Sequence, residues 1–92
     1  MAQVIITFRV MPESPDTDIA AVEKKVKATI AKFTGNSEFR TDVQPFAFGL
    51  KALTITFIMD ESKGSTEDLE KQVSDLEGVN SVEVTDVRRA VG

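Results

Sequence analysis

The hydrophobic periodicity of this chain changes along its length in an order that leaves few possible folds. Apolar residues alternate with period two over residues 3–10 and are rich in β-branched types, which predicts a strand. Both faces of that strand carry apolar groups, so we expect it to be internal to a sheet. From Ile19 onward the apolar residues recur at steps of three and four, which predicts a helix. That apolar stripe comprises Ile19, Val22, Val26, Ile30 and Phe33.

The second half of the chain repeats these two kinds of element. A weaker alternation predicts a strand over about residues 38–46, after which the chain reverses at Gly49. A third strand follows, a second helix begins after Ser65 as its N-cap, and a last strand covers residues 79–87. The residues expected to face the core are Leu53, Ile55, Phe57 and Met59 in the third strand, Leu69, Val73 and Leu76 in the helix, and Val82 and Val84 in the last strand.

The resulting order of elements is β-α-β-β-α-β. Each β-α-β half requires a right-handed crossover connection. The two halves together predict a ferredoxin-like α+β fold, a split sandwich in which a four-stranded antiparallel sheet carries both helices on one face. A chain of 92 residues builds a single core, so we expect one domain over residues 1–92.

The side chains that the chain lacks restrict its chemistry. It contains no histidine, cysteine, tyrosine or tryptophan. The commonest general base near neutral pH, the best soft nucleophile and the usual zinc ligands are therefore missing. We expect a binding or regulatory module that is not an enzyme and that uses no cofactor or metal.

Charge and hydropathy restrict the cellular compartment and the kinds of partner that we expect. No apolar run approaches the length of about 18 residues that spans a bilayer, and the start of the chain lacks the features of a secretory signal. Without cysteines, an intracellular setting is the default. The net charge of −4 argues against a broad nucleic-acid surface. The lysines that cluster in the first helix are expected on a solvated face, namely Lys24, Lys25, Lys27 and Lys32.

Several known functions of this topology fit the residues poorly. RNA-recognition modules display aromatic side chains on a basic sheet face, whereas this chain is acidic and is expected to place threonines and Arg9 there. The paired cysteines of metal chaperones are absent, and MPESPD (11–16) is a poor phosphate cradle. Residues 60–71 resemble a calcium loop only in part, because the twelfth position is Lys71 in place of a bidentate glutamate.

Two aromatic side chains have no obvious place in this core. Phe46 and Phe48 stand beside Gly49, at the predicted reversal between the second and third strands. The rings either fold back and close one end of the core, or one of them is exposed and enters a partner. A partner-binding loop benefits from a rigid aromatic side chain, which buries about 150–250 Å² at a small cost in entropy.

Three stretches resemble the archaeal elongation factor 1-beta family and the C-terminal domain of its eukaryotic relatives. They are AFGLKAL (47–53), DESKGSTEDLE (60–70) and VNSVEVTDVRR (79–89), in matching order and spacing. The resemblance covers essentially the whole chain. It implies a factor of protein biosynthesis that promotes guanine-nucleotide exchange on elongation factor 1-alpha, the GTPase that delivers aminoacyl-tRNA to the ribosome.

The same resemblance implies the partner and the setting. We expect a cytoplasmic protein, monomeric when free, that binds this GTPase in its GDP-bound and nucleotide-free forms. No direct contact with nucleic acid or with a membrane is implied.

The resemblance also implies which part of the chain enters the partner. In the eukaryotic relatives the hairpin aromatic inserts into the GTPase, and the residue that matches it here is Phe48. Phe46, Gly49 and Lys51 belong to the same hairpin and are expected to bind the partner with it. A solvated side chain explains Lys51 equally well.

The end of the chain departs from the pattern of these relatives. A lysine near their C-terminus reaches the magnesium and phosphate region, whereas this chain has no lysine after Lys71. Arg88 and Arg89 are the only nearby cations, and we count them as candidate partner-binding residues. A guanidinium differs from a compact ammonium group, so their equivalence to that lysine is open.

Two further functions share the topology. An amino-acid-sensing regulatory module would pair edge to edge into dimers and usually accompanies an enzyme domain. A purely structural interaction domain would bind the GTPase without changing the rate of nucleotide release.

Overall fold

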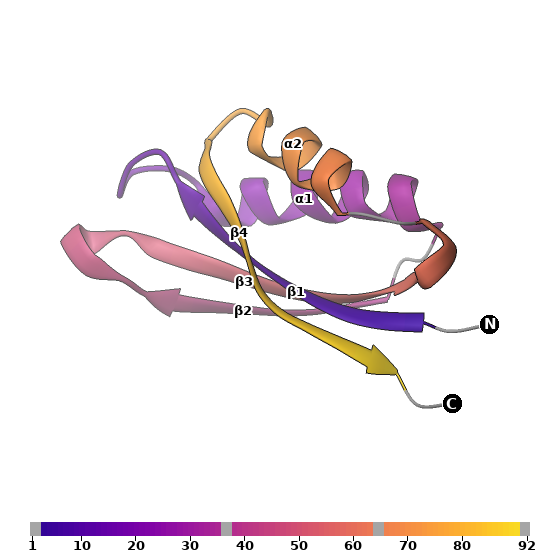
Figure 1. Cartoon of the computed structure of the whole chain (residues 1–92). Helices are drawn as coiled ribbons and strands as arrows, with labels where there is room; N and C mark the ends of the chain where they lie inside the picture. The colour runs from indigo at the N-terminus through magenta and orange to yellow at the C-terminus, as the bar shows by residue number, and fades with distance from the viewer. Residues whose placement is uncertain (1–2, 36–37, 64–65, 91–92) are drawn as a thin grey trace.

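The computed structural model describes residues 3–35, 38–63 and 66–90, which form two layers (Figure 1). One layer is a twisted sheet, and both helices cover one face of it. Within the described residues, neither helix is long and apolar enough to cross a membrane. The elements are β1 (Gln3–Pro12), α1 (Ile19–Thr34), β2 (Phe39–Pro45), the short 3₁₀ turn η1 (Ala47–Gly49), β3 (Lys51–Asp60), a second 3₁₀ turn η2 (Glu61–Lys63), α2 (Glu67–Ser74) and β4 (Val79–Ala90).

The four strands form one sheet in the order β2-β3-β1-β4, and every neighbouring pair is antiparallel. The predicted ferredoxin-like α+β fold is confirmed, as is the internal position of the first strand. Figure 1 shows the β2–β3 turn at one end of the sheet, and the start of β1 and the end of β4 at the other. The two ends of the sheet therefore carry different parts of the chain.

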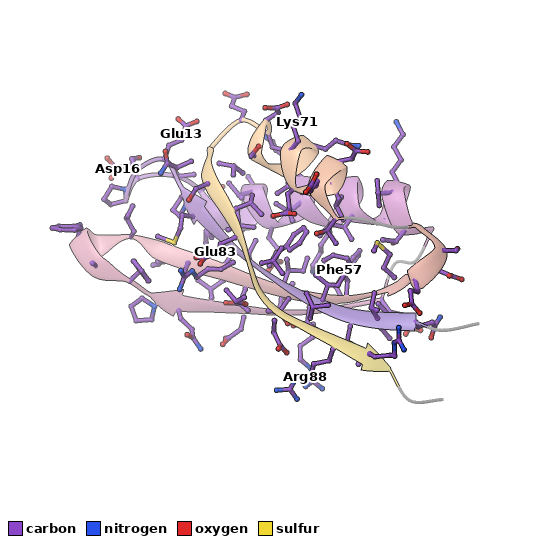
Figure 2. All side chains as sticks on the ribbon, viewed as in Figure 1. Glu13, Asp16, Phe57, Lys71, Glu83 and Arg88 are labelled. Atoms are coloured by element: carbon purple, nitrogen blue, oxygen red, sulfur yellow. The ribbon has the colours of Figure 1, made fainter. Side chains whose placement is uncertain are left out.

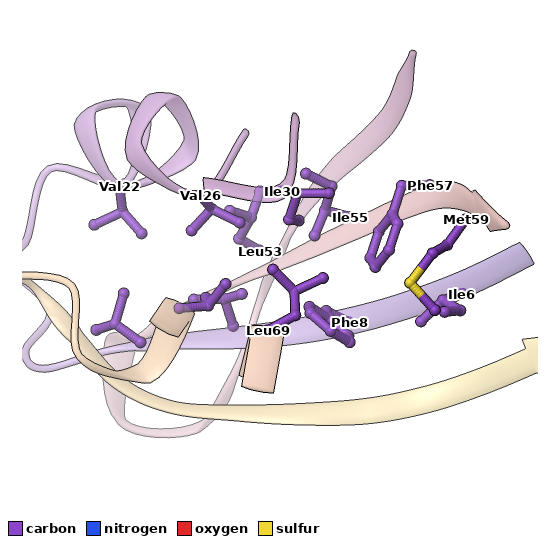
Figure 3. Close-up of a cluster of buried hydrophobic side chains, with 13 residues drawn as sticks. Ile6, Phe8, Val22, Val26, Ile30, Leu53, Ile55, Phe57, Met59 and Leu69 are labelled. Carbon is purple, nitrogen blue, oxygen red and sulfur yellow. The ribbon is translucent and has the colours of Figure 1, made fainter. Parts of the chain in front are cut away.

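The core lies between the sheet and the helices (Figure 3). Phe8 and Phe57 meet edge to face there, with ring centres 5.0 Å apart. Burying one large apolar side chain contributes about 1.5–3 kcal/mol, so this interface between layers dominates the stability of the fold. The core residues are Ile6, Phe8 and Val10 of β1, Leu53, Ile55, Phe57 and Met59 of β3, Val22, Val26 and Ile30 of α1, Leu69 and Val73 of α2, and Val79.

Helix α1 begins at Ile19, where the predicted apolar stripe starts, and both of its ends are capped. The carboxylate of Asp18 accepts hydrogen bonds from two backbone N–H groups of the first turn, at 3.1 and 3.4 Å. Gly35 ends the helix with a left-handed backbone at φ 74°. Among the clustered lysines, Lys27 pairs with Glu23 and the others are exposed, in agreement with a solvated face.

Helix α2 is shorter than its hydrophobic stripe predicts. It ends at Ser74, so Leu76 lies in the following turn, although Leu76 still packs against the core. The tight turn after the helix, in which the N–H of Leu76 bonds to the carbonyl of Val73, brings that side chain inward. Thr66 occupies the N-cap position, whereas Ser65, the predicted cap, lies outside the described residues.

The first and last strands are longer than predicted. β4 continues past Val87 to Ala90 because β1 begins at Gln3, which pairs with Ala90 in register. The candidate residues Arg88 and Arg89 therefore lie in a strand and not in a tail. At the opposite end of the same pair of strands, β1 continues beyond the predicted residue 10 to Pro12, which lies opposite Val79. Proline suits a strand end because it lacks an N–H donor.

Candidate partner-binding hairpin

The turn between β2 and β3 has a defined backbone structure. Phe48 and Gly49 both adopt left-handed conformations, with φ of 62° and 75°. Positive φ at two consecutive central residues characterises the type I′ turn, whose twist matches that of the flanking strands. Two backbone hydrogen bonds close the turn, from the Leu50 nitrogen to the Ala47 oxygen at 3.3 Å and from the Phe46 nitrogen to the Leu50 oxygen at 2.7 Å. The hairpin is therefore an ordered element.

Phe48 stands at the apex of this turn and is 93% exposed. A left-handed backbone costs a residue with a Cβ atom about 1–2 kcal/mol. Because the ring stays in water, it recovers almost none of the free energy that burial would give. The alternative in which both rings close the end of the core is therefore wrong for Phe48. A strained and exposed aromatic residue is typical of a binding site.

Phe46 has different surroundings, although only one residue separates it from Phe48. Its side chain is 47% exposed, and its ring centre lies 5.4 Å from the guanidinium carbon of Arg9 on β1. Arg9 in turn forms an ion pair with Glu83 on β4. The base of the hairpin is thus attached to the sheet, whereas the apex projects from it.

Gly49 and Lys51 complete the predicted group at this end of the sheet. A Cβ atom at Gly49 would lie 3.8 Å from the Cβ of Pro15, so the hairpin lies against the loop between β1 and α1. Lys51 is exposed and pairs in register with Pro45 at the start of β3. It forms no ion pair within the part of the chain that the structure describes.

Arg88 and Arg89 pair with the first residues of β1, near the other end of the sheet, and Figure 2 shows Arg88 beside the half of β4 that lies away from the hairpin. Arg88 is opposite Ile5, which is itself opposite Ile58 of β3. Ile58 comes seven residues after Lys51, which corresponds to about 23 Å at roughly 3.3 Å per residue. The structure therefore brings four of the six predicted site residues together and separates the two arginines from them.

Both arginines are paired in the free protein. The Nε atom of Arg88 is 2.9 Å from the carboxylate of Asp86, and Arg89 pairs with Glu61. All four side chains are substantially exposed, and such surface pairs contribute only about 0–1 kcal/mol each. A phosphate or an acidic group of a partner can replace either carboxylate at small cost.

The rest of the described surface offers no assembled reactive site. Within residues 3–35, 38–63 and 66–90, no group of three or more acidic side chains could hold a metal ion. A shallow hollow of about 400 Å³ opens toward the uncovered face of the sheet, at the end away from the hairpin, with Ile5, Arg40 and Ile58 in its lining. The fold and the projecting hairpin define a class of protein, a small α+β domain that exposes an aromatic side chain at the apex of an ordered hairpin.

Comparison with known proteins identifies the family. Residues 5–90 match the EF-1 guanine nucleotide exchange domain. The chain is 43% identical to elongation factor 1-beta of Methanothermobacter thermautotrophicus, over 97% of this chain and 98% of the relative. It is 38% identical to the protein of that name from Staphylothermus marinus, with the same coverage. The chain therefore belongs to the EF-1 guanine nucleotide exchange domain family.

A solved structure shows the same fold without informing function. The de novo designed protein Foldit4 superposes with a TM-score of 0.62 over 98% of each chain, at 16% sequence identity. At so low an identity the similarity concerns the fold alone. The ferredoxin-like arrangement is thus compatible with more than one function, and the function here follows from the family.

Membership of this family confirms the activity that the sequence resemblance implied. The chain promotes guanine-nucleotide exchange on elongation factor 1-alpha in translation elongation. Nucleotide exchange shifts binding equilibria and involves no bond chemistry, so the chain is not an enzyme. The amino-acid-sensing alternative is set aside.

The sequence predicts the hairpin but not the contact that holds its base against the sheet. Arg9 was expected on the uncovered face of the sheet, which is confirmed, but its contact with Phe46 was not predicted. The available signal was a cation on the internal strand β1 together with an aromatic residue just past the end of β2, which is two strands away in the sheet. The left-handed backbone of Phe48 was not predicted either, because hairpin turns with two consecutive positive φ values usually place asparagine, aspartate or glycine at that position.

Proposed function

We propose that the chain releases GDP from elongation factor 1-alpha by inserting Phe48 into the GTPase. The observation that carries this proposal is the 93% exposure of Phe48 at the apex of a hydrogen-bonded, left-handed turn. Because the turn is already ordered, insertion loses little further conformational entropy, and most of the free energy of burying the ring contributes to binding. Release of GDP then allows GTP to bind.

Insertion promotes exchange only if the pocket for the ring differs between states of the GTPase. A partner that binds the nucleotide-free state more tightly weakens nucleotide binding by the same factor, through thermodynamic linkage. If the chain bound the two states of the GTPase with equal affinity, the equilibrium between them would not change. A pocket that forms when the nucleotide-binding loops rearrange supplies the required preference. Phe48 then stabilises the state that has lost GDP.

Arg88 and Arg89 provide a second contact in this proposal. They lie about 23 Å from the hairpin along the sheet, so they meet a different surface of the GTPase. There they approach phosphate or acidic groups, which replace Asp86 and Glu61 as their partners. Lys51, beside the hairpin, belongs to the first contact.

We further propose that the free chain is a monomer and works in the cytoplasm, where translation takes place. The edge strand β4 carries a bulge opposite β1 and the charged side chains of Glu83, Asp86 and Arg88, all of which discourage edge-to-edge pairing. Sedimentation equilibrium at micromolar concentration should give the mass of one chain. Twice that mass would contradict the proposal.

Phe48→Ala tests the role of the hairpin directly. The substitution removes an exposed ring and leaves the core intact, so the domain stays folded by circular dichroism. We expect GDP release from cognate elongation factor 1-alpha, at saturating exchange factor, to slow by about tenfold or more, as is typical of a central aromatic anchor. A fluorescent GDP analogue in stopped flow measures that rate.

Val43→Ala is the matched control, because it truncates another exposed apolar side chain on the same hairpin. It should leave the release rate unchanged. A folded Phe48→Ala protein that releases GDP as fast as wild type would remove Phe48 from the mechanism. Binding of the GTPase without any acceleration by the wild-type chain would instead favour a purely structural interaction domain.

A further inference from the structure

Arg9 connects the base of the hairpin to the far edge of the sheet. It lies on the uncovered face of the central strand β1, opposite Thr54 on β3. Its guanidinium carbon is 5.4 Å from the ring centre of Phe46, and its Nη2 atom pairs with the carboxylate of Glu83 on β4. Figure 2 places Glu83 on the half of β4 nearer the hairpin, away from Arg88. One side chain therefore contacts both the hairpin and an edge strand.

The stability of the free domain gives little reason for an arginine at this position. The Nε atom of Arg9 is buried and has no hydrogen-bond partner among the described residues. An unpartnered buried donor is unfavourable. The ion pair with Glu83 is partly exposed and returns little free energy, and an exposed cation–π contact is also weak. An apolar side chain could reproduce neither the ion pair with Glu83 nor the cation–π contact with Phe46, and of these two contacts only the second reaches the hairpin.

Phe46 is the point at which this contact can restrain the apex. Its N–H closes the hairpin by bonding to the carbonyl of Leu50 at 2.7 Å. It is also the N-cap residue of η1 and directly follows the last residue of β2. A ring held against the Arg9 guanidinium restrains the direction in which the chain leaves the sheet, and Phe48 follows two residues later.

We propose that Arg9 is a positioning residue for nucleotide exchange. Held by Glu83, it stacks on Phe46 and keeps the hairpin in the arrangement that presents Phe48. This inference rests on the proposed insertion of Phe48. Preorganisation lowers the entropy that insertion would otherwise lose. Because the ring enters only the rearranged GTPase, loss of positioning lowers the maximal release rate and changes the half-saturating concentration of the factor much less.

Three variants separate positioning from stability. Arg9→Met keeps an unbranched apolar stem and removes the cation, whereas Arg9→Lys keeps a charge that can still face the ring. Arg40→Met is the matched control, because Arg40 is an arginine on the same uncovered face, opposite Thr56, without a contact to either hairpin aromatic among the described residues.

Two measurements apply to each variant. Amide hydrogen exchange in the free protein reports the opening of the Phe46 N–H, with the N–H of the fully buried Ile55 as the reference for global unfolding. GDP release from cognate elongation factor 1-alpha, titrated with the factor, gives the maximal rate and the half-saturating concentration. For Arg9→Met we expect hydrogen exchange at Phe46 to accelerate about fivefold and maximal release to slow about fivefold, with half-saturation within about twofold of wild type.

Arg9→Lys should recover at least about half of the maximal rate, and Arg40→Met should match wild type in both measurements. Unchanged hydrogen exchange at Phe46 in Arg9→Met overturns the inference, whatever the release rate. Faster hydrogen exchange at Phe46 in Arg9→Met, together with a wild-type rate of GDP release, also overturns the inference, provided that Phe48→Ala slows GDP release as expected. If Phe48→Ala itself retains the wild-type rate, the proposed function fails, and hydrogen exchange alone decides whether Arg9 orders the hairpin.

Discussion

Phe48 combines two costs in one residue, a left-handed backbone and a ring held in water. Turns of this type usually place asparagine or glycine at the first central position, since these residues tolerate positive φ. The aromatic side chain is therefore retained at the expense of the stability of the free domain. Local strain of this kind persists where the surrounding structure enforces it, and here the flanking strands and their hydrogen bonds do so.

Phe48→Asn should therefore stabilise the domain while it removes exchange activity. Asparagine relieves the left-handed strain, and the lost ring made almost no buried contact, so we expect the free energy of unfolding to rise by about 0.5–1 kcal/mol. Urea denaturation measures that change, and fluorescent GDP release measures the activity. Phe48→Ala, which keeps the strain, is the control and should show no such gain. A variant that is less stable, or one that retains exchange, would contradict this reading of the turn.

At the scale of single elements, β4 explains why the two arginines do not form a tail. Its pairing with β1 runs from Val79 to Ala90, and alternate residues of this edge strand face the two sides of the sheet. Arg88 lies on the uncovered face, opposite Ile5, and Arg89 lies on the helix side, opposite Val4. The strand fixes the backbone positions of the two arginines near the far end of the sheet, on opposite faces.

The double substitution Arg88→Ala with Arg89→Ala should weaken exchange less than the loss of Phe48. Exposed charges act through screened interactions, so we expect the rate of GDP release to be about two- to fivefold lower than with the wild-type chain at about 0.1 M salt. As salt is added, the release rate should fall less for the variant than for the wild-type chain. GDP release over a salt series measures both. Lys24→Ala with Lys25→Ala removes two adjacent exposed cations from α1 and should behave as wild type. A full rate for the arginine variant at every salt concentration would exclude an electrostatic role.

The sequence predicts the elements of this fold better than their ends. Burial determines the faces of β1, α1 and β3, and the inward side chains of Phe8, Val26 and Ile55 appear where the hydrophobic periodicity places them. The end of β4 depends on how far β1 extends beside it, which local periodicity does not contain. The contact of Arg9 with Phe46 depends on strand register in the same way. The exposure of Phe48 required the turn geometry, since a phenylalanine next to a strand is equally compatible with a core.

At the scale of the whole molecule, the candidate contacts occupy the two ends of an elongated body with extents of 42 × 20 × 19 Å. A continuous four-stranded sheet joins those ends, so the hairpin and the arginines keep a fixed spacing. A rigid body with two separated contacts can favour one arrangement of a GTPase over another, because only the matching arrangement satisfies both. Nucleotide exchange therefore depends on how strongly the chain prefers the nucleotide-free state of the GTPase over the GDP-bound state.

The most direct test compares the affinity of the chain for nucleotide-free and GDP-loaded elongation factor 1-alpha. The wild-type chain should bind the nucleotide-free form at least about tenfold more tightly, and Phe48→Ala should lose most of that ratio while it still binds. Titration calorimetry on both forms of the GTPase provides the two affinities for each protein. A Phe48→Ala chain that keeps the wild-type ratio would show that the preference for the empty state comes from elsewhere in the molecule.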